Sequence, residues 1–169
     1  MASRTSVPEA SFLGAYARKG AFTDCYTVSV PGTVTLPEFI LAFYTTPLFK
    51  VERWLLEKAL HIKSTDEQAL LLARAASERF SAWKVEQRAS NEILMDAGQT
   101  RSWLSVLPQA PGDATTTLLF GSAVVPMRPG GKFGLAFHAL LGFHRLYSKL
   151  LLSAASRRVV ALRKAGNAA

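Results

Sequence analysis

The sequence predicts an α+β fold in which a long C-terminal helix covers an antiparallel sheet. Side chains alternate between apolar and polar over residues 21–30, and again in four short segments between residues 81 and 125, which is the period of half-buried strands. From Phe133 to about Leu162 the apolar side chains instead recur at three- and four-residue steps, which indicates one long helix. A chain of 169 residues with 49% hydrophobic content is expected to form one domain with a substantial core.

The N-terminal region is expected to have two parts. Residues 1–11 are small, polar and interrupted by Pro8, so we expect a flexible arm, followed by a single domain over residues 12–169. The first strand of that domain covers residues 21–30 and ends at Pro31-Gly32. The side chains on one of its faces are Phe22, Asp24, Tyr26, Val28 and Val30.

Three helices are predicted before the chain returns to strands. Thr35 stands before Leu36-Pro37-Glu38, the pattern of an N-cap with proline in the first turn, and predicts a helix to about Tyr44. A second helix starts at Thr46-Pro47, and Ser64-Thr65-Asp66-Glu67 resembles a capping box at the start of a third. In the second helix the residues expected to pack inward are Leu48, Val51, Leu55 and Ala59.

Four further strands are predicted at residues 81–89, 91–96, 100–107 and 115–125. The turns between them are short and contain Asp, Gly and Pro, which favours an antiparallel meander and gives about five strands in all. Trp83 and Val85 share one face of the first of these strands, and Glu86 and Arg88 share the other.

The C-terminal segment carries the whole net charge of +8. Between Ala114 and Ala169 there are eight Lys or Arg and no Asp or Glu, whereas residues 1–113 contain twelve of each sign. The last helix is apolar on nearly all sides, so we expect it to be covered by the sheet and also by the earlier helices or a second subunit. A homodimer would use its outer side, around Phe143, Leu146 and Leu150.

Charge and composition also bear on partners and location. The basic end of the last helix is explained by the helix dipole, so specific nucleic-acid binding is not expected. Residues 133–152 include His138, His144, Arg145 and Lys149, which argues against a membrane span and leaves contact with a membrane surface as a secondary alternative. The single Cys25 and the lack of a continuous apolar N-terminal run predict a cytoplasmic protein.

Several segments carry a resemblance to a known superfamily: Trp83-Lys-Val-Glu-Gln-Arg88, Asn91-Glu-Ile-Leu-Met-Asp96, Gly98-Gln-Thr-Arg-Ser-Trp103 and Leu119-Phe-Gly-Ser122. With the element order they resemble an uncharacterised bacterial family of the START and Bet v 1-like (SRPBCC) superfamily, over residues 22–158. The resemblance implies a helix-grip fold, with a curved sheet around the last helix and a cavity between them for an apolar or amphipathic molecule. Members include carriers, cyclases and dehydratases, so the resemblance assigns no reaction.

Four residues are candidates for the wall of such a cavity. Trp83 and Trp103 have the spacing to point at a common interior, as ligand-contacting rings or as plain core. Arg101 alternates with Trp103, so it either binds a carboxylate head group or forms a salt bridge with Asp96 or Glu92. His144 lies in the middle of the apolar helix face, where it lines a pocket or is a hydrogen-bonded core histidine.

The leading hypothesis is therefore binding of a small apolar or amphipathic molecule between the sheet and the last helix. The alternatives are a noncatalytic dimeric interaction protein and a weak cyclase- or hydrolase-like enzyme that uses His144 as a general base. No catalytic residue is assigned and no cofactor is expected. No metal site is expected either, because His138 and His144 are six residues apart and point about 120° from each other around the helix.

Overall fold

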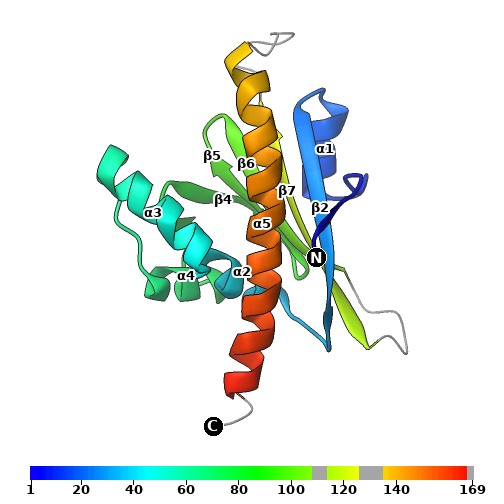
Figure 1. Cartoon of the computed structure of the whole chain (residues 1–169), viewed down its shortest axis with the longest axis vertical. Coiled ribbons are helices and arrows are strands. Elements are labelled where there is room, and N and C mark those ends of the chain that lie inside the picture. The colour runs from blue at the N-terminus through cyan, green and yellow to red at the C-terminus, as the bar shows by residue number, and fades with distance from the viewer. Residues whose placement is uncertain (108–113, 126–134, 167–169) are drawn as a thin grey trace.

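The fold was analysed in a computed structural model that describes residues 1–107, 114–125 and 135–166, without the side chains of Leu60 and residues 135–143. These residues form a seven-stranded antiparallel sheet and five helices (Figure 1). The strands are β1 (Ser3–Arg4), β2 (Phe22–Pro31), β3 (Arg79–Phe80), β4 (Trp83–Arg88), β5 (Glu92–Ala97), β6 (Thr100–Leu107) and β7 (Thr115–Val124). The helices are α1 (Phe12–Arg18), α2 (Leu36–Tyr44), α3 (Pro47–Leu60), α4 (Asp66–Ala73) and α5 (Leu135–Gly166).

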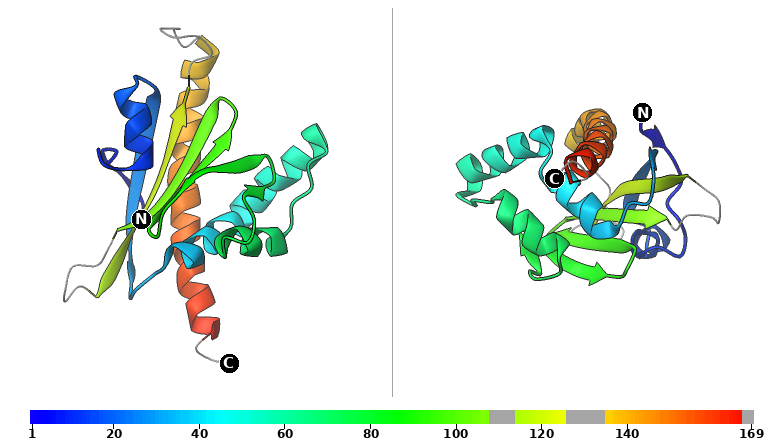
Figure 2. Two further views of the ribbon diagram at one scale, coloured as in Figure 1. Left: turned by 180° about the vertical axis from the view of Figure 1, so that it is seen from behind. Right: turned by 90° about the horizontal axis from the view of Figure 1, so that it is seen from below.

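The strand order is β1-β2-β7-β6-β5-β4-β3, so β2 and β7 are neighbours although they are far apart in the sequence. They pair over ten residues, from Phe22 opposite Val124 to Pro31 opposite Thr115. The helix α5 lies across one face of the sheet, beside α2, α3 and α4, and α1 lies on the other face (Figures 1 and 2). The predicted α+β class, with an antiparallel sheet and a long C-terminal helix in a helix-grip arrangement, is confirmed.

The helix starts are set by local hydrogen bonds, as the sequence indicated. Thr35 and Thr65 each form a capping box with the residue three positions later. Thr46 accepts a hydrogen bond from the amide of Phe49 at 3.1 Å and begins α3. These caps fix where α2, α3 and α4 begin.

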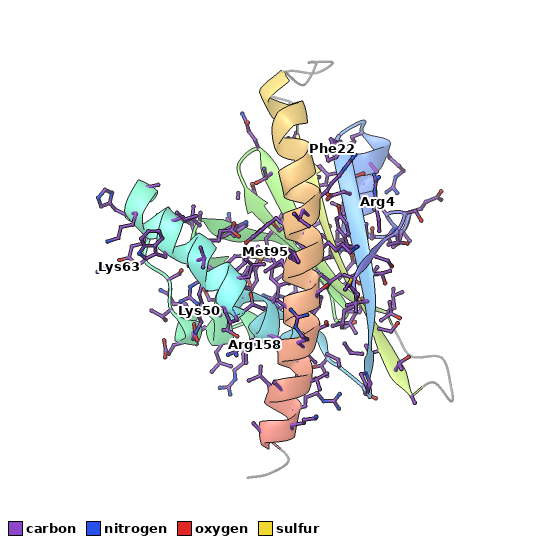
Figure 3. The ribbon with its side chains drawn as sticks, viewed as in Figure 1. Arg4, Phe22, Lys50, Lys63, Met95 and Arg158 are labelled. Carbon is purple, nitrogen blue, oxygen red and sulfur yellow. The ribbon has the colours of Figure 1, made fainter. Side chains whose placement is uncertain are left out.

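The sheet divides the core into two parts. The larger part lies between the sheet and α2, α3, α4 and α5, where Figure 3 shows Met95 among the central side chains. The smaller part lies between the sheet and α1, and its buried members are Leu13, Cys25, Leu94, Trp103, Leu119 and Ala123. Because both faces of the sheet are covered, apolar side chains occur at both alternating sets of strand positions.

The inward face of α3 differs from the expectation. Of the four residues expected to pack inward, Leu48 contacts the core, whereas Val51 (56% exposed), Leu55 (53% exposed) and Ala59 are exposed. The side of α3 that packs inward carries Phe49, which is buried. The helix has two apolar rows, and its approach to α5 and the sheet selects the row with the aromatic ring.

The structure contains two short strands that the sequence pattern did not indicate. The strand β1 pairs with β2, Ser3 opposite Thr27, and the amide of Ala2 donates to Ser153 Oγ at 3.2 Å. Residues 1–11, expected as an arm, therefore include a segment in contact with both the sheet and α5. The strand β3 pairs with β4, with Phe80 opposite Trp83. Two-residue strands are too short to show a period-two pattern.

An irregularity in β4 reverses one predicted orientation. The register against β5 shifts between Val85 and Gln87, as in a β-bulge. Glu86 remains on the α1 face, but Arg88 reaches the helical side, where its guanidinium donates to the Leu72 carbonyl at 2.9 Å. Arg88 therefore does not share the outer face with Glu86.

None of the helices in the described residues is long and apolar enough to cross a membrane.

A Gly121→Ala change should destabilise the fold, because a Cβ at this position would collide with Leu13 Cδ2 and would stand 2.8 Å from the Asp24 carbonyl oxygen. Such overpacking costs about 1–3 kcal/mol, which urea unfolding would measure. Gly166→Ala is the matched control, because nothing lies within 4 Å of its Cβ. Equal unfolding free energies for the two variants would contradict the close packing of α1 against β7.

Candidate functional site

A polar row crosses the helix-covered face of the sheet. Asp24 on β2 stands opposite Ser122 on β7, and Ser122 stands opposite Ser102 on β6. The next row along the same face is apolar, with Tyr26 opposite Phe120. Three polar side chains on neighbouring strands of a buried face require hydrogen-bond partners, and α5 provides one of them.

His144 projects from α5 onto this row. Ser122 Oγ donates to Asp24 Oδ1 at 2.6 Å and lies 2.9 Å from His144 Nε2. The same ring nitrogen is 3.4 Å from Asp24 Oδ2 and 3.5 Å from Ser148 Oγ. The Asp24 side chain has no exposed surface, whereas that of His144 is 37% exposed. The imidazole thus separates the buried carboxylate from the space beside α5.

The Asp24 carboxyl group is held in its ionised form. Burial by itself raises its pKa, but the opposing His144 ring and the Ser122 hydroxyl outweigh this effect, so the pKa of Asp24 lies below its ordinary value. Its Oδ2 accepts no well-aligned hydrogen bond from any residue that the structure describes. An ionised, incompletely partnered carboxylate therefore lies behind His144.

A second carboxylate enters the site from α3. The Tyr147 hydroxyl, on α5, donates to Glu52 Oε2. Burial raises the pKa of Glu52 despite this hydrogen bond, and burial together with the nearby carboxylate raises the pKa of Tyr147. This pair connects the two helices beside the His144 cluster.

These groups border a cavity of about 240 Å³ between the sheet, α3 and α5. Its apolar wall consists of Phe43, Phe49, Trp83, Phe120 and Leu151. Two aromatic pairs in this wall are close, with ring centroids 4.9 Å apart for Phe43 and Phe120 and 5.5 Å apart for Phe49 and Trp83. The polar groups that face the cavity include Glu52, Ser102, Ser122, His144 and Tyr147. An aromatic wall with a few convergent polar groups is typical of a small-molecule site.

The hydrogen bonding differs from that of a catalytic serine triad. In such a triad the serine and the carboxylate contact different nitrogens of the histidine, so that the histidine can take the serine proton. Here Ser122 and Asp24 both approach Nε2, and the Ser122 hydroxyl donates a hydrogen bond to Asp24 Oδ1 and not to the histidine. The arrangement orients His144 and holds Ser122 as an acceptor toward the cavity, which suits ligand binding. Among the described residues, no group of three or more His, Cys, Asp or Glu side chains lies close enough to hold a metal ion.

Of the four residues predicted for the cavity wall, Trp83, Arg101 and His144 border the cavity and Trp103 does not. Trp103 does not share the interior of Trp83: it is buried on the α1 face, where its Nε1 donates to Glu92 Oε2 at 2.6 Å. The predicted orientation of Trp103 was wrong because both faces of the sheet are covered. The sequence pattern of a tryptophan buried on one face is then the same as that of a tryptophan buried on the other.

Arg101 borders the cavity, but its guanidinium is engaged elsewhere. It forms salt bridges with Glu86 and, at 2.8 Å, with Asp96, and it donates to the hydroxyl of Tyr16 at 3.1 Å. Of the two roles considered for Arg101, the structure shows the salt bridge with Asp96. A ligand carboxylate would have to displace these partners.

Three polar residues of the site, Asp24, Ser122 and Glu52, were not selected from the sequence. Asp24 had a visible signal, because it is a carboxylate on the otherwise apolar face of its predicted strand. Ser122 and Glu52 had no comparable signal, since their partners His144 and Tyr147 are 22 and 95 residues away. His138 and Phe143, also named from the sequence, have side chains outside the described residues.

No protein-family model matches the chain, and no curated protein matches it. Two solved structures are distantly similar. A conserved protein of unknown function from Enterococcus faecalis, EF2215, has 11% identity and a TM-score of 0.40, with 81% of this chain and 71% of that chain covered. CalU16 from Micromonospora echinospora has 11% identity and a TM-score of 0.33, with 95% and 92% covered. Both likenesses are too distant to support an argument about function.

Replacing Ser122 by Ala should reduce stability in a pH-dependent way. The pKa of Asp24 is lowered in the folded state, so its contribution is complete above the ordinary value of 3.8 and is lost as the pH falls through the folded-state value. Removing the hydrogen bond from Ser122 to this carboxylate should cost about 1.5–3 kcal/mol at pH 7, and less as the pH is lowered below about 4.

Urea unfolding of both proteins between pH 7 and pH 3 measures this difference. Ser156→Ala is the control, because the Ser156 hydroxyl is also buried but donates to the Ser153 carbonyl, which does not titrate. A loss of stability for Ser122→Ala that is constant across this pH range would argue against an ionised Asp24 as its partner.

Proposed function

We propose that the protein binds a small, largely apolar molecule with one polar end in the cavity between the sheet, α3 and α5. The observation that carries the proposal is the mixed lining of this cavity, in which a cluster of packed aromatic rings and the polar His144 and Glu52 groups border one space. Buried polar groups that face an apolar space favour a ligand that can hydrogen-bond to them.

The size of the cavity limits the ligand. Pockets for drug-sized molecules measure roughly 300–1,000 Å³, and this cavity is smaller, at about 240 Å³. A single ring with a short polar tail is therefore the expected scale. Under the same proposal the chain is a helix-grip protein of START and Bet v 1-like type, which the order of its elements supports.

Narrowing the cavity should abolish binding. Ser102 is half-buried and lies on the cavity side of β6, so Ser102→Phe would place a ring in the ligand's space. The control is Thr117→Phe, because Thr117 is half-buried on the opposite face of the neighbouring strand β7. Native mass spectrometry, followed by extraction of whatever is released on denaturation, should find an apolar adduct on the wild type and on Thr117→Phe, and at least about tenfold less on Ser102→Phe.

Equal loading of all three proteins would locate the ligand elsewhere. A wild type that carries no adduct and binds no single-ring compound would count against the proposal as a whole.

A second candidate function, self-association, rests on a different surface. Leu146 (57% exposed) and Leu150 (49% exposed) lie on the outer side of α5, and Val51 and Leu55 on α3 are also about half exposed. Leu150 borders a groove that also includes Pro47 and Leu48 of α3, so the start of α3 lies beside Leu150. A second copy of the chain would bury this apolar surface. Phe143, the third residue expected at such an interface, is outside the described side chains.

Leu146→Glu should convert a dimer formed in this way into a monomer, because the new charge would be buried at the interface. Size-exclusion chromatography with light scattering would show the change in mass. Lys164→Glu, an exposed change near the end of α5, is the control and should leave the mass unaltered. A wild-type chain that is monomeric at every protein concentration measured would exclude this second function.

A further inference from the structure

The charges around the cavity restrict the chemistry of its ligand. We propose that the polar end of the ligand is a cationic amine and that the cavity discriminates against carboxylates. This inference rests on the proposed function. The argument comes from where the basic and acidic side chains around the cavity have their partners.

The basic side chains at the cavity do not provide an anion site. Among the described residues that border it, the basic ones are Arg101 and His144. Arg101 is bound by Glu86 and Asp96, and its guanidinium faces Tyr16 of α1. His144 faces Asp24 at 3.4 Å, so a proton on its ring would be balanced by the carboxylate behind it. These described residues therefore leave no net positive charge for a ligand carboxylate.

The acidic side chains are less completely compensated. Asp24 is fully buried, with Ser122 as hydrogen-bond donor to Oδ1 and with Oδ2 lacking a well-aligned donor within the described part of the chain. Glu52 borders the cavity directly and accepts from Tyr147, which is a neutral donor. With His144 either neutral or protonated, the cluster of Asp24, Glu52 and His144 carries a net charge of zero or below.

Burial strengthens this preference. An anion brought into the cavity would lose its hydration and would meet no uncompensated positive charge among the described residues that border the cavity, which is costly in an apolar surrounding. An ammonium group has three donors and would find acceptors in Glu52 and in the hydroxyl oxygens of Ser122 and Ser102. The aromatic wall adds favourable contacts with a cation, because ring faces carry negative charge density. The ion pair with Glu52 is the contact that a neutral ligand could not make.

The effect of ligand charge on affinity can be measured with three single-ring probes of similar shape: phenethylamine, 2-phenylethanol and 3-phenylpropanoate. At pH 7.5 the first is a cation, the second is neutral and the third is an anion. Titration calorimetry on the full chain should show that affinity falls from the amine to the alcohol to the acid. The affinities of the amine and the acid should differ by at least about tenfold. The acid binding as tightly as the amine, or the alcohol binding more tightly than the amine, would overturn the inference and leave the proposed cavity function standing.

Binding of none of the three probes would count against the inference and against the proposed function together.

A pair of variants identifies the contact responsible. Glu52→Gln keeps the shape of the side chain and removes its charge. It should therefore weaken the binding of the amine by about tenfold and leave the binding of the alcohol unchanged. Glu57→Gln removes a charge from the same helix at a residue that does not border the cavity, so both probes should bind it as they bind the wild type. Equal weakening of amine and alcohol in Glu52→Gln would show a structural role for Glu52 and would overturn its assignment as the ammonium partner.

Discussion

The structure depends on the need to provide partners for one buried charge. The carboxylate of Asp24 is buried on β2, on the face of the sheet that α5 covers, and its partners come from β7 and α5. An unpaired charge at this depth would cost several kcal/mol, so β2, β7 and α5 have to meet in one register for the core to form. Apolar packing alone would accept several positions of α5 along the sheet, and the Asp24 cluster favours one of them.

The same constraint explains why a cavity lies beside these groups. The row of Asp24, Ser122 and Ser102 cannot be covered tightly by apolar side chains without isolating hydroxyl groups. The neighbouring space is instead bordered both by aromatic rings and by the hydrogen-bonded pair of Glu52 and Tyr147. Packing and polarity thus change within a short distance along α5.

The fold was predictable from the sequence to a greater extent than the site. Period-two alternation, threonine caps and the three- and four-residue apolar period are local properties. They correctly indicated the long strands, the starts of α2, α3 and α4, and the long helix α5. The orientation of Trp103 was not predictable, because α1 covers the second face of the sheet and makes both sets of strand positions apolar. For the same reason, only tertiary packing decides that Phe49, and not Val51, is the buried residue of α3. Glu52 depends on a partner 95 positions away, and no local pattern contains that information.

The pairing of β2 with β7 has a consequence for how the chain reaches its native state. These two neighbouring strands pair over ten residues, but β3 to β6 and three helices lie between them in the sequence. Phe22 cannot pair with Val124 until all of this intervening chain is present. Such long-range pairing slows folding, because the intervening chain must be ordered or looped before the contact forms. During synthesis β2 leaves the ribosome long before β7 exists, so the backbone N–H and C=O groups that pair with β7 are exposed to other chains for that interval.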